Sequence, residues 1–289
     1  MVRLKLAATL AAVAVLIALY PIQRASTQTT QGNAGTPTGI SVDQADAPPG
    51  TESLAVQWVN VAVPGLGVML AAVARPGGAG PFPTIVLLHG THGFAQEYVR
   101  LAQDLASGGD VVAVAACWFR GNAGSGARFI TPIACPDGPP MSPPASPESL
   151  QAVTALIQAV RTLPGANPDR VGLLGHSRGA SPIMSYIVSA GDVRAAILNS
   201  AGYPAGLSTE VKAPILMLHG TADSPADGGV AVTNIQMARD FEAKLRAAGK
   251  PVEAVYYEGG RHNDIFASST QYRDEVQKMV TFLRRHLRE

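Results

Sequence analysis

Charged side chains are scarce in this sequence of 289 residues, and their signs are balanced. They make up 15% of the residues, and 22 Lys and Arg against 21 Asp and Glu leave a formal net charge of +1. No long run of like charge is present, so the sequence lacks the basic patch by which proteins attract nucleic acids or anionic membrane surfaces. We therefore expect no nucleic-acid partner.

Cysteine is also scarce, since Cys117 and Cys135 are the only two in the chain. They form no Cys-x-x-Cys motif, and no His-Glu-x-x-His motif occurs, so ligand spacing predicts no metal site. We expect no cofactor, and the chemistry must then come from ordinary side chains. The two thiols would pair as a disulfide in an oxidising compartment, and the alternative is two separate buried thiols.

The N-terminal segment, residues 1–25, differs in composition from the rest of the chain. Two basic residues precede an apolar stretch from Leu6 to about Tyr20, a pattern typical of a secretory signal. No clean small-x-small cleavage site follows, so a cleaved signal peptide and a retained N-terminal anchor both fit. A Thr-, Gln-, Gly- and Pro-rich tract then predicts a flexible linker over residues 26–52. We expect an extracytoplasmic protein, either secreted or attached to the membrane through this segment.

Residues 53–289 alternate between strand and helix patterns, and the 47% apolar composition of the full chain supports a substantial core. Short apolar runs predict strands at 54–63, 67–74, 84–88, 110–118, 171–174, 193–198, 214–218 and 252–257. Helical spacing predicts helices at 94–107, 149–163, 181–189, 234–248 and 272–287. This order predicts the α/β class, with a mostly parallel central sheet and helices on both faces. The strands ending at Leu198 and starting at Pro214 leave little room for a lid domain.

The strongest functional motif is Gly175-His176-Ser177-Arg178-Gly179, between the predicted strand at 171–174 and a predicted helix. Gly-x-Ser-x-Gly in this context is typical of a nucleophile elbow. Small residues two positions on either side of the serine allow the sharp turn that lifts the hydroxyl above the sheet. Ser177 is therefore the candidate nucleophile.

A serine hydroxyl needs a general base, and the base needs a carboxylate that orients it. Among the six histidines, His262 lies in a Gly-rich loop that directly follows the predicted strand at 252–257. Asp223 follows the preceding predicted strand, and the order serine, aspartate, histidine along the chain is the one that typically accompanies a nucleophile elbow. Asp227 lies in the same loop and is the rival for the acid.

An acyl-transfer site also needs hydrogen-bond donors for the developing oxyanion. The elbow itself supplies the backbone N–H of Arg178. The turn after the predicted strand at 84–88 would supply a second donor, the N–H of Thr91 or that of His92.

Four motifs together carry a resemblance to a known superfamily. They are Leu-His-Gly at 88–90, Gly-His-Ser-Arg-Gly at 175–179, Leu-His-Gly-Thr-Ala-Asp at 218–223 and Gly-Gly-Arg-His at 259–262. The chain resembles α/β-hydrolases, most closely dienelactone-hydrolase-like proteins and the catalytic domain of prolyl-oligopeptidase-like enzymes, over roughly Leu54 to Leu287. Dienelactone hydrolases proper use cysteine where this chain has Ser177, and prolyl-oligopeptidase-like peptidases carry an additional N-terminal propeller. The resemblance therefore implies the α/β-hydrolase fold and serine hydrolase chemistry without naming a substrate.

These observations predict an exported serine hydrolase that cleaves small-molecule or polymeric carboxylic esters through an acyl-enzyme. Two alternatives stay open. The same three residues could pass the acyl group to an alcohol, which would make the protein an acyltransferase, or the scaffold could be a non-catalytic binding protein. No sequence pattern indicates the oligomeric state.

Overall fold

The structure is a computed structural model of the chain, and it describes residues 39–121 and 128–288. The segment 1–25, predicted as a signal peptide or anchor, lies outside the described residues. No helix within those two ranges is long and apolar enough to cross a membrane.

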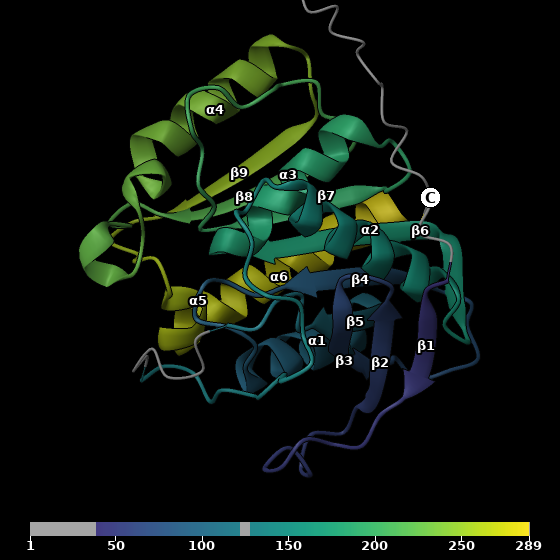
Figure 1. The fold of residues 1–289 in the computed structure, drawn as a ribbon. Helices are drawn as coiled ribbons and strands as arrows, with labels where there is room; N and C mark the ends of the chain where they lie inside the picture. Colours follow the sequence, from purple (N-terminus) through teal and green to yellow (C-terminus); the bar gives the residue numbers. More distant parts are fainter. Residues whose placement is uncertain (1–38, 122–127, 289) are drawn as a thin grey trace, which may run out of the picture. The chain divides into compact units, whose positions relative to one another are not determined.

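One nine-stranded sheet runs through the described residues, in the order β1-β2-β3-β5-β4-β6-β7-β8-β9 (Figure 1). The strands are β1 (Ser41–Gln44), β2 (Gln57–Val63), β3 (Gly67–Ala74), β4 (Phe82–Leu88), β5 (Val112–Ala116), β6 (Ala166–His176), β7 (Ala195–Asn199), β8 (Ile215–Gly220) and β9 (Val252–Tyr257). β4 to β9 pair in parallel, whereas β1, β2 and β3 are antiparallel to their neighbours. The loops that follow the parallel strands therefore gather along one edge of the sheet, where open α/β sheets bind ligands.

Helices cover both faces of this sheet (Figure 1). They are α1 (Gln96–Gly109), α2 (Pro147–Arg161), α3 (Ala180–Ser189), α4 (Ile235–Ala247), α5 (Asp264–Ala267) and α6 (Ser269–Leu287). α2, α3 and α4 pack into one buried cluster and α1, α5 and α6 into the other. Successive residues of β4 alternate between the clusters, Ile85 in one and Val86 in the other. A strand covered on both sides must be apolar at every position, which explains its uninterrupted apolar run.

The predicted α/β class, with a mostly parallel central sheet and helices on both faces, is confirmed. Residues 200–214, which connect β7 to β8, contain neither a helix nor a strand. The hairpin β2–β3 and the alternating helices also lie where periodicity predicted them, within a few residues at their ends.

The predicted linker over residues 26–52 is wrong in its C-terminal part, because β1 lies inside it. β1 pairs antiparallel with β2, and Ile40 and Val42 pack against the core. An edge strand needs only an open neighbouring backbone and a few apolar contacts, so the polar composition of the tract concealed it. β6 likewise begins at Ala166 rather than 171, through a polar extension that pairs with β4 across an irregular register.

Candidate active site

Ser177 lies at the sharp turn between β6 and α3. Its φ of +51° is in the left-handed region, which L-residues other than glycine rarely adopt. Both flanking glycines are sterically required. A Cβ atom on Gly175 would lie 2.5 Å from the backbone N of Ala180, and one on Gly179 would collide with the carbonyl of Leu88. The elbow predicted from the sequence is therefore present, with the strain typical of functional positions.

His262 lies between Ser177 and Asp223 and is hydrogen bonded to both. Its Nε2 is 2.8 Å from Ser177 Oγ, and its Nδ1 is 2.7 Å from Asp223 Oδ2. Since an ionised carboxylate can only accept, Nδ1–H donates to Asp223 and Nε2 accepts from the serine hydroxyl. His262 is 2% and Asp223 4% exposed, so little water competes for these bonds. The structure thus brings together the three residues that the sequence indicated, from the loops after β6, β8 and β9.

Asp223 has further partners that fix its carboxylate. Thr233 Oγ1 lies 2.8 Å from Asp223 Oδ1 and 2.9 Å from the carbonyl oxygen of Val230, so its single proton is shared between these two acceptors. His219 Nε2 lies 3.3 Å from Asp223 Oδ2 and 2.6 Å from the carbonyl of Thr233, which identifies Nε2 as protonated. Burial lowers the pKa of His219, which keeps the ring neutral. Sequence reasoning missed this support, because Thr233 reaches the site only through the 3₁₀ turn Ala231–Thr233.

Asp227, the rival for the acid, occupies a different position. Its side chain is 28% exposed and forms an ion pair with Arg261, with 3.4 Å between Oδ1 and Nη1. Its carbonyl accepts from Asn263 Nδ2 over 3.0 Å. The geometry therefore favours Asp223 as the carboxylate that faces the imidazole.

The turn after β4 lies directly against the elbow. A Cβ atom on Gly90 would be 3.2 Å from Ser177 Cβ, so this backbone passes beside the serine. The N–H of Gly90 donates to Tyr98 Oη over 2.9 Å and is thereby occupied. Thr91 is the next residue in the turn, and Arg178 lies in the first turn of the helical segment, where N–H groups have no intrahelical acceptor. The roles of Thr91 and Arg178 as oxyanion donors stay predictions.

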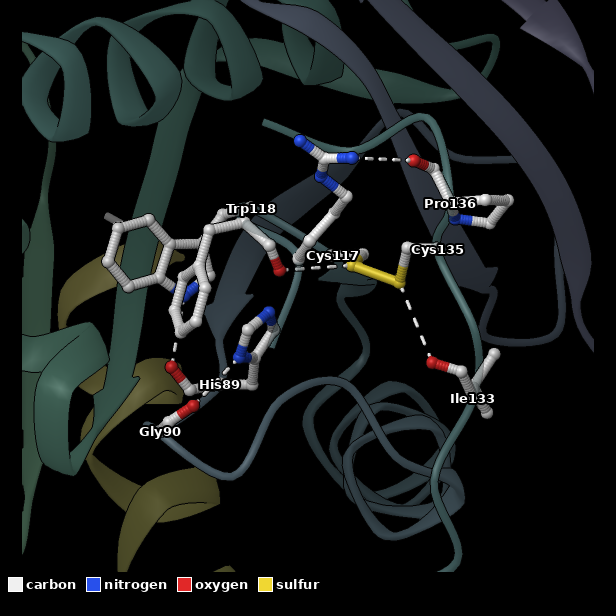
Figure 2. The surroundings of a disulfide bond; sticks show 9 residues. His89, Gly90, Cys117, Trp118, Ile133, Cys135 and Pro136 are labelled. Atoms are coloured by element: carbon white, nitrogen blue, oxygen red, sulfur yellow. Dashed lines mark hydrogen bonds between the residues drawn. A yellow bond between two sulfur atoms is a disulfide. The ribbon is translucent and has the colours of Figure 1, made fainter. Parts of the chain in front are cut away.

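Neutral polar and aromatic side chains hold this turn through hydrogen bonds. Trp118 Nε1 donates to the carbonyl of His89 over 2.9 Å, and His89 Nδ1 donates to that of Gly90 over the same distance (Figure 2). Burial lowers the pKa of His89 to about 4 and that of His92 to about 2. Both rings are therefore uncharged at neutral pH, and His92 Nε2 accepts from Tyr98 Oη–H over 2.8 Å.

A disulfide joins Cys117 to Cys135, with 6.5 Å between the Cα atoms (Figure 2). It ties the loop after β5 to the end of that strand. The same loop pairs with the start of α1, through the bridge between Pro132 and Ala95 and the hydrogen bond from Gln96 N to the carbonyl of Thr131. The predicted pairing of the two cysteines is confirmed in the structure.

Within residues 39–121 and 128–288, no three His, Cys, Asp or Glu side chains are grouped so that they could hold a metal ion.

Comparison with solved structures finds the same fold in several hydrolases. A protein assigned to the dienelactone hydrolases, from Klebsiella pneumoniae, is 19% identical, with a TM-score of 0.60 over 84% of this chain and 98% of that one. An esterase from Pyrococcus furiosus is 14% identical, with a TM-score of 0.62 over 84% and 97% of the two chains. An esterase from Thermogutta terrifontis is 17% identical, with a TM-score of 0.57 over 75% and 87%. At these identities the likeness shows the fold alone.

A comparison with curated proteins finds no sequence that matches this chain. The family model described as "Dienelactone hydrolase family" matches residues 69–286, which include the elbow, the candidate acid and the candidate base. On that match the chain belongs to the dienelactone hydrolase family and is a hydrolase of the α/β-hydrolase superfamily.

Proposed function

We propose that the protein is a serine hydrolase that cleaves carboxylic esters through a covalent acyl-enzyme. The observation that carries this proposal is the continuous hydrogen-bonded series from Ser177 through His262 to Asp223. In this reading His262 Nε2 takes the proton of Ser177 as Oγ attacks the ester carbonyl, and Asp223 stabilises the imidazolium that forms.

The developing negative charge then needs donors placed where the carbonyl oxygen will lie. The backbone N–H groups of Arg178 and Thr91 are proposed for this role, because the elbow and the turn after β4 adjoin at Ser177. His262 next returns its proton to the leaving alcohol. A water molecule, deprotonated by the same imidazole, attacks the acyl-enzyme and releases the acid.

The direct test is hydrolysis of p-nitrophenyl esters of graded acyl length by the wild type and by Ser177→Ala. Removal of a triad serine lowers kcat by about 10⁶-fold in enzymes of this type, and a loss of this order is expected. Ser185→Ala is the matched control, since its hydroxyl only donates back to the carbonyl of Ser181 within α3. Equal activity in Ser177→Ala and the wild type would contradict the proposal.

We further infer that the enzyme works outside the cytoplasm, as a secreted protein or one attached through its N-terminal segment. Two features support this proposal, namely the signal-like pattern of residues 1–25 and the disulfide between Cys117 and Cys135. Cell fractionation, with N-terminal sequencing of the recovered protein, distinguishes a cleaved leader from a retained anchor. Recovery of the intact chain in the cytoplasm with both thiols reduced would refute export.

A further inference from the structure

A buried carboxyl group lies close to the site but is not used in the mechanism proposed above. Glu275, on α6, is only 1% exposed. Its Oε1 accepts from Gln271 Nε2 over 2.7 Å, and its Oε2 lies 2.5 Å from Asn199 Nδ2 at the end of β7. Carboxyl groups are rarely buried to this extent without a cationic partner. Neither contact of Glu275 is to a cation.

A series of hydrogen-bonding contacts leads from Glu275 to the candidate base. Asn199 Oδ1 is 2.7 Å from His176 Nδ1, and His176 Nε2 is 3.2 Å from Asn263 Oδ1. We call Glu275, Asn199, His176 and Asn263 the buried relay. Glu275 lies at one end of the relay. Asn263, at the other end, directly follows His262 in the sequence. Within the relay, His176 directly precedes Ser177.

The relay is not satisfied when Glu275 is ionised and His176 is neutral. Asn199 Nδ2 then donates to the carboxylate, and its Oδ1 accepts from His176 Nδ1–H. This leaves His176 Nε2 without a proton, facing Asn263 Oδ1, so two acceptors oppose each other. Asn263 cannot rotate to offer its amide group, because its Nδ2 donates to the carbonyl of Asp227.

One additional proton on Glu275 removes this conflict. The side-chain amide of Asn199 then rotates by half a turn. Its Oδ1 accepts from the carboxyl O–H of Glu275, and its Nδ2 donates to His176 Nδ1. His176 remains neutral, with its single proton on Nε2, and donates to Asn263 Oδ1. The only net change is the proton that Glu275 takes from solvent, and every contact in the relay now pairs a donor with an acceptor.

The same proton could instead lie on His176 as an imidazolium, but burial opposes that arrangement. Burial, together with the nearby His262, lowers the pKa of His176 to about 4. Burial is the main cause that raises the pKa of Glu275 to about 8. The hydrogen bonds from Gln271 and Asn199 oppose this rise, and the carboxylates of Asp274 and Asp264 contribute to it. At neutral pH the proton is therefore held by Glu275.

We propose that Glu275 is a positioning residue that holds His262 in place for proton transfer through the buried relay, and only while its carboxyl group is protonated. This inference rests on the proposed role of His262 as the general base. In the protonated state His176 donates to Asn263 and so anchors the loop that carries His262. In the ionised state that anchor is lost, although Ser177 and Asp223 keep their own contacts.

The inference predicts a loss of activity at alkaline pH. The titratable groups that face Glu275 are Asp274 on α6, Asp264 on α5 and Tyr257 on β9, with His176 reached through Asn199. Glu275 loses its proton as pH rises through about 8, and the anchored population falls with it.

The test compares kcat and KM of the wild type and Glu275→Gln from pH 6 to pH 10. Glutamine carries the donor and acceptor of a protonated carboxyl group but cannot ionise. We expect kcat of the wild type to fall by up to about tenfold per pH unit above the transition, until it reaches the lower kcat of the ionised enzyme. We expect Glu275→Gln to match the wild type at pH 7 and to keep its kcat at pH 9.5. KM should change little, because no relay atom is proposed to touch the substrate.

Asp274→Asn is the matched control, an exposed carboxyl group next to Glu275 on the same helix. It should keep the alkaline fall, with its midpoint displaced slightly to lower pH because one neighbouring negative charge is gone. Two results would overturn the inference, namely a wild type whose kcat does not fall above pH 8, and a Glu275→Gln variant that falls as the wild type does.

A second readout does not depend on activity and so separates this inference from the proposed function. The ¹⁵N shifts of the His176 imidazole report which ring nitrogen carries the proton. We expect Nε2–H at pH 7, a change to Nδ1–H as pH rises past the transition, and Nε2–H throughout in Glu275→Gln. A wild type with Nδ1–H at pH 7 would refute the relay even if Ser177→Ala confirms the hydrolase, and also if Glu275→Gln fails to fold.

Discussion

The two sides of the elbow are held by different forces. On one side, the loops after β8 and β9 carry Asp223 and His262, and buried polar side chains such as Thr233 and His219 hold them. On the other side, the loop after β5 is held by the disulfide at Cys117 and by aromatic packing at its start.

Because of this difference, we expect changes on the polar side to lower mainly the catalytic rate, and changes at the disulfide to lower mainly the stability of the fold. A hydrogen bond fixes both the position and the protonation of its partner, so a change in the polar side should alter proton transfer while leaving the fold intact. A disulfide restricts the chain without specifying any protonation state, so its removal should lower stability more than it lowers the rate.

Asp223→Asn should lower kcat by about 10⁴-fold, which is the loss typical of this change in a serine triad. The amide can donate to His262 Nδ1 and thus favour the wrong tautomer, with the proton on Nε2 where the base must accept. Ester hydrolysis at saturating substrate measures the loss, and thermal unfolding should show little change.

Asp227→Asn is the matched control for Asp223→Asn, because the Asp227 carboxylate is in the same loop after β8 and pairs with Arg261 at the surface. Its kcat should stay within a few-fold of the wild type, since surface ion pairs contribute about 0–1 kcal/mol. If Asp227→Asn proved the more damaging of the two, the assignment of the acid to Asp223 would be wrong.

The positions of the nucleophile, base and acid could be predicted from the sequence because each depends on local features. Ser177 is marked by two glycines that the backbone geometry demands, and His262 and Asp223 each follow an apolar strand in a parallel sheet. Parallel strands end along the same edge, so three loops distant in the sequence were expected to meet.

The side chains that hold the nucleophile, base and acid in place could not be predicted as fully from the sequence. Glu275 lies four residues before Met279, on the stripe of α6 that also buries Leu283. A carboxyl group on an apolar stripe was thus a visible signal, although its partner Asn199 lies on another element. Thr233 gave no such signal, because its contact with Asp223 depends on how the loop after β8 folds back.

Replacement of Cys117 and Cys135 by alanine should reduce the free energy of unfolding by about 3 kcal/mol, as expected for a closed loop of this length. The loss follows from the greater freedom of the unfolded chain. Denaturant titration measures it, and kcat should fall by less than tenfold because no triad contact is removed. Since the chain has only these two cysteines, dithiothreitol treatment of the wild type is a matched control and should reproduce the loss. A fall in kcat as large as that of Asp223→Asn would show that the loop after β5 also sets the catalytic rate. The two sides of the elbow would then not differ as proposed.

Thr233→Val gives the finest test, because valine keeps the shape of threonine and removes only the hydroxyl, which lies 2.8 Å from Asp223 Oδ1 and also bonds to the backbone of Val230. A hydrogen bond to a charged group is worth about 1.5–3 kcal/mol, so kcat should fall by roughly 10- to 100-fold. Thr281→Val is the control, since that exposed hydroxyl only bonds to the carbonyl of Gln277 within α6, and its kcat should not change. If Thr233→Val lowered the unfolding free energy but left kcat unaltered, the buried polar contacts would stabilise the fold just as the disulfide does. A lower kcat with a nearly unchanged KM would instead show that the orientation of Asp223 limits how well His262 accepts the proton of Ser177.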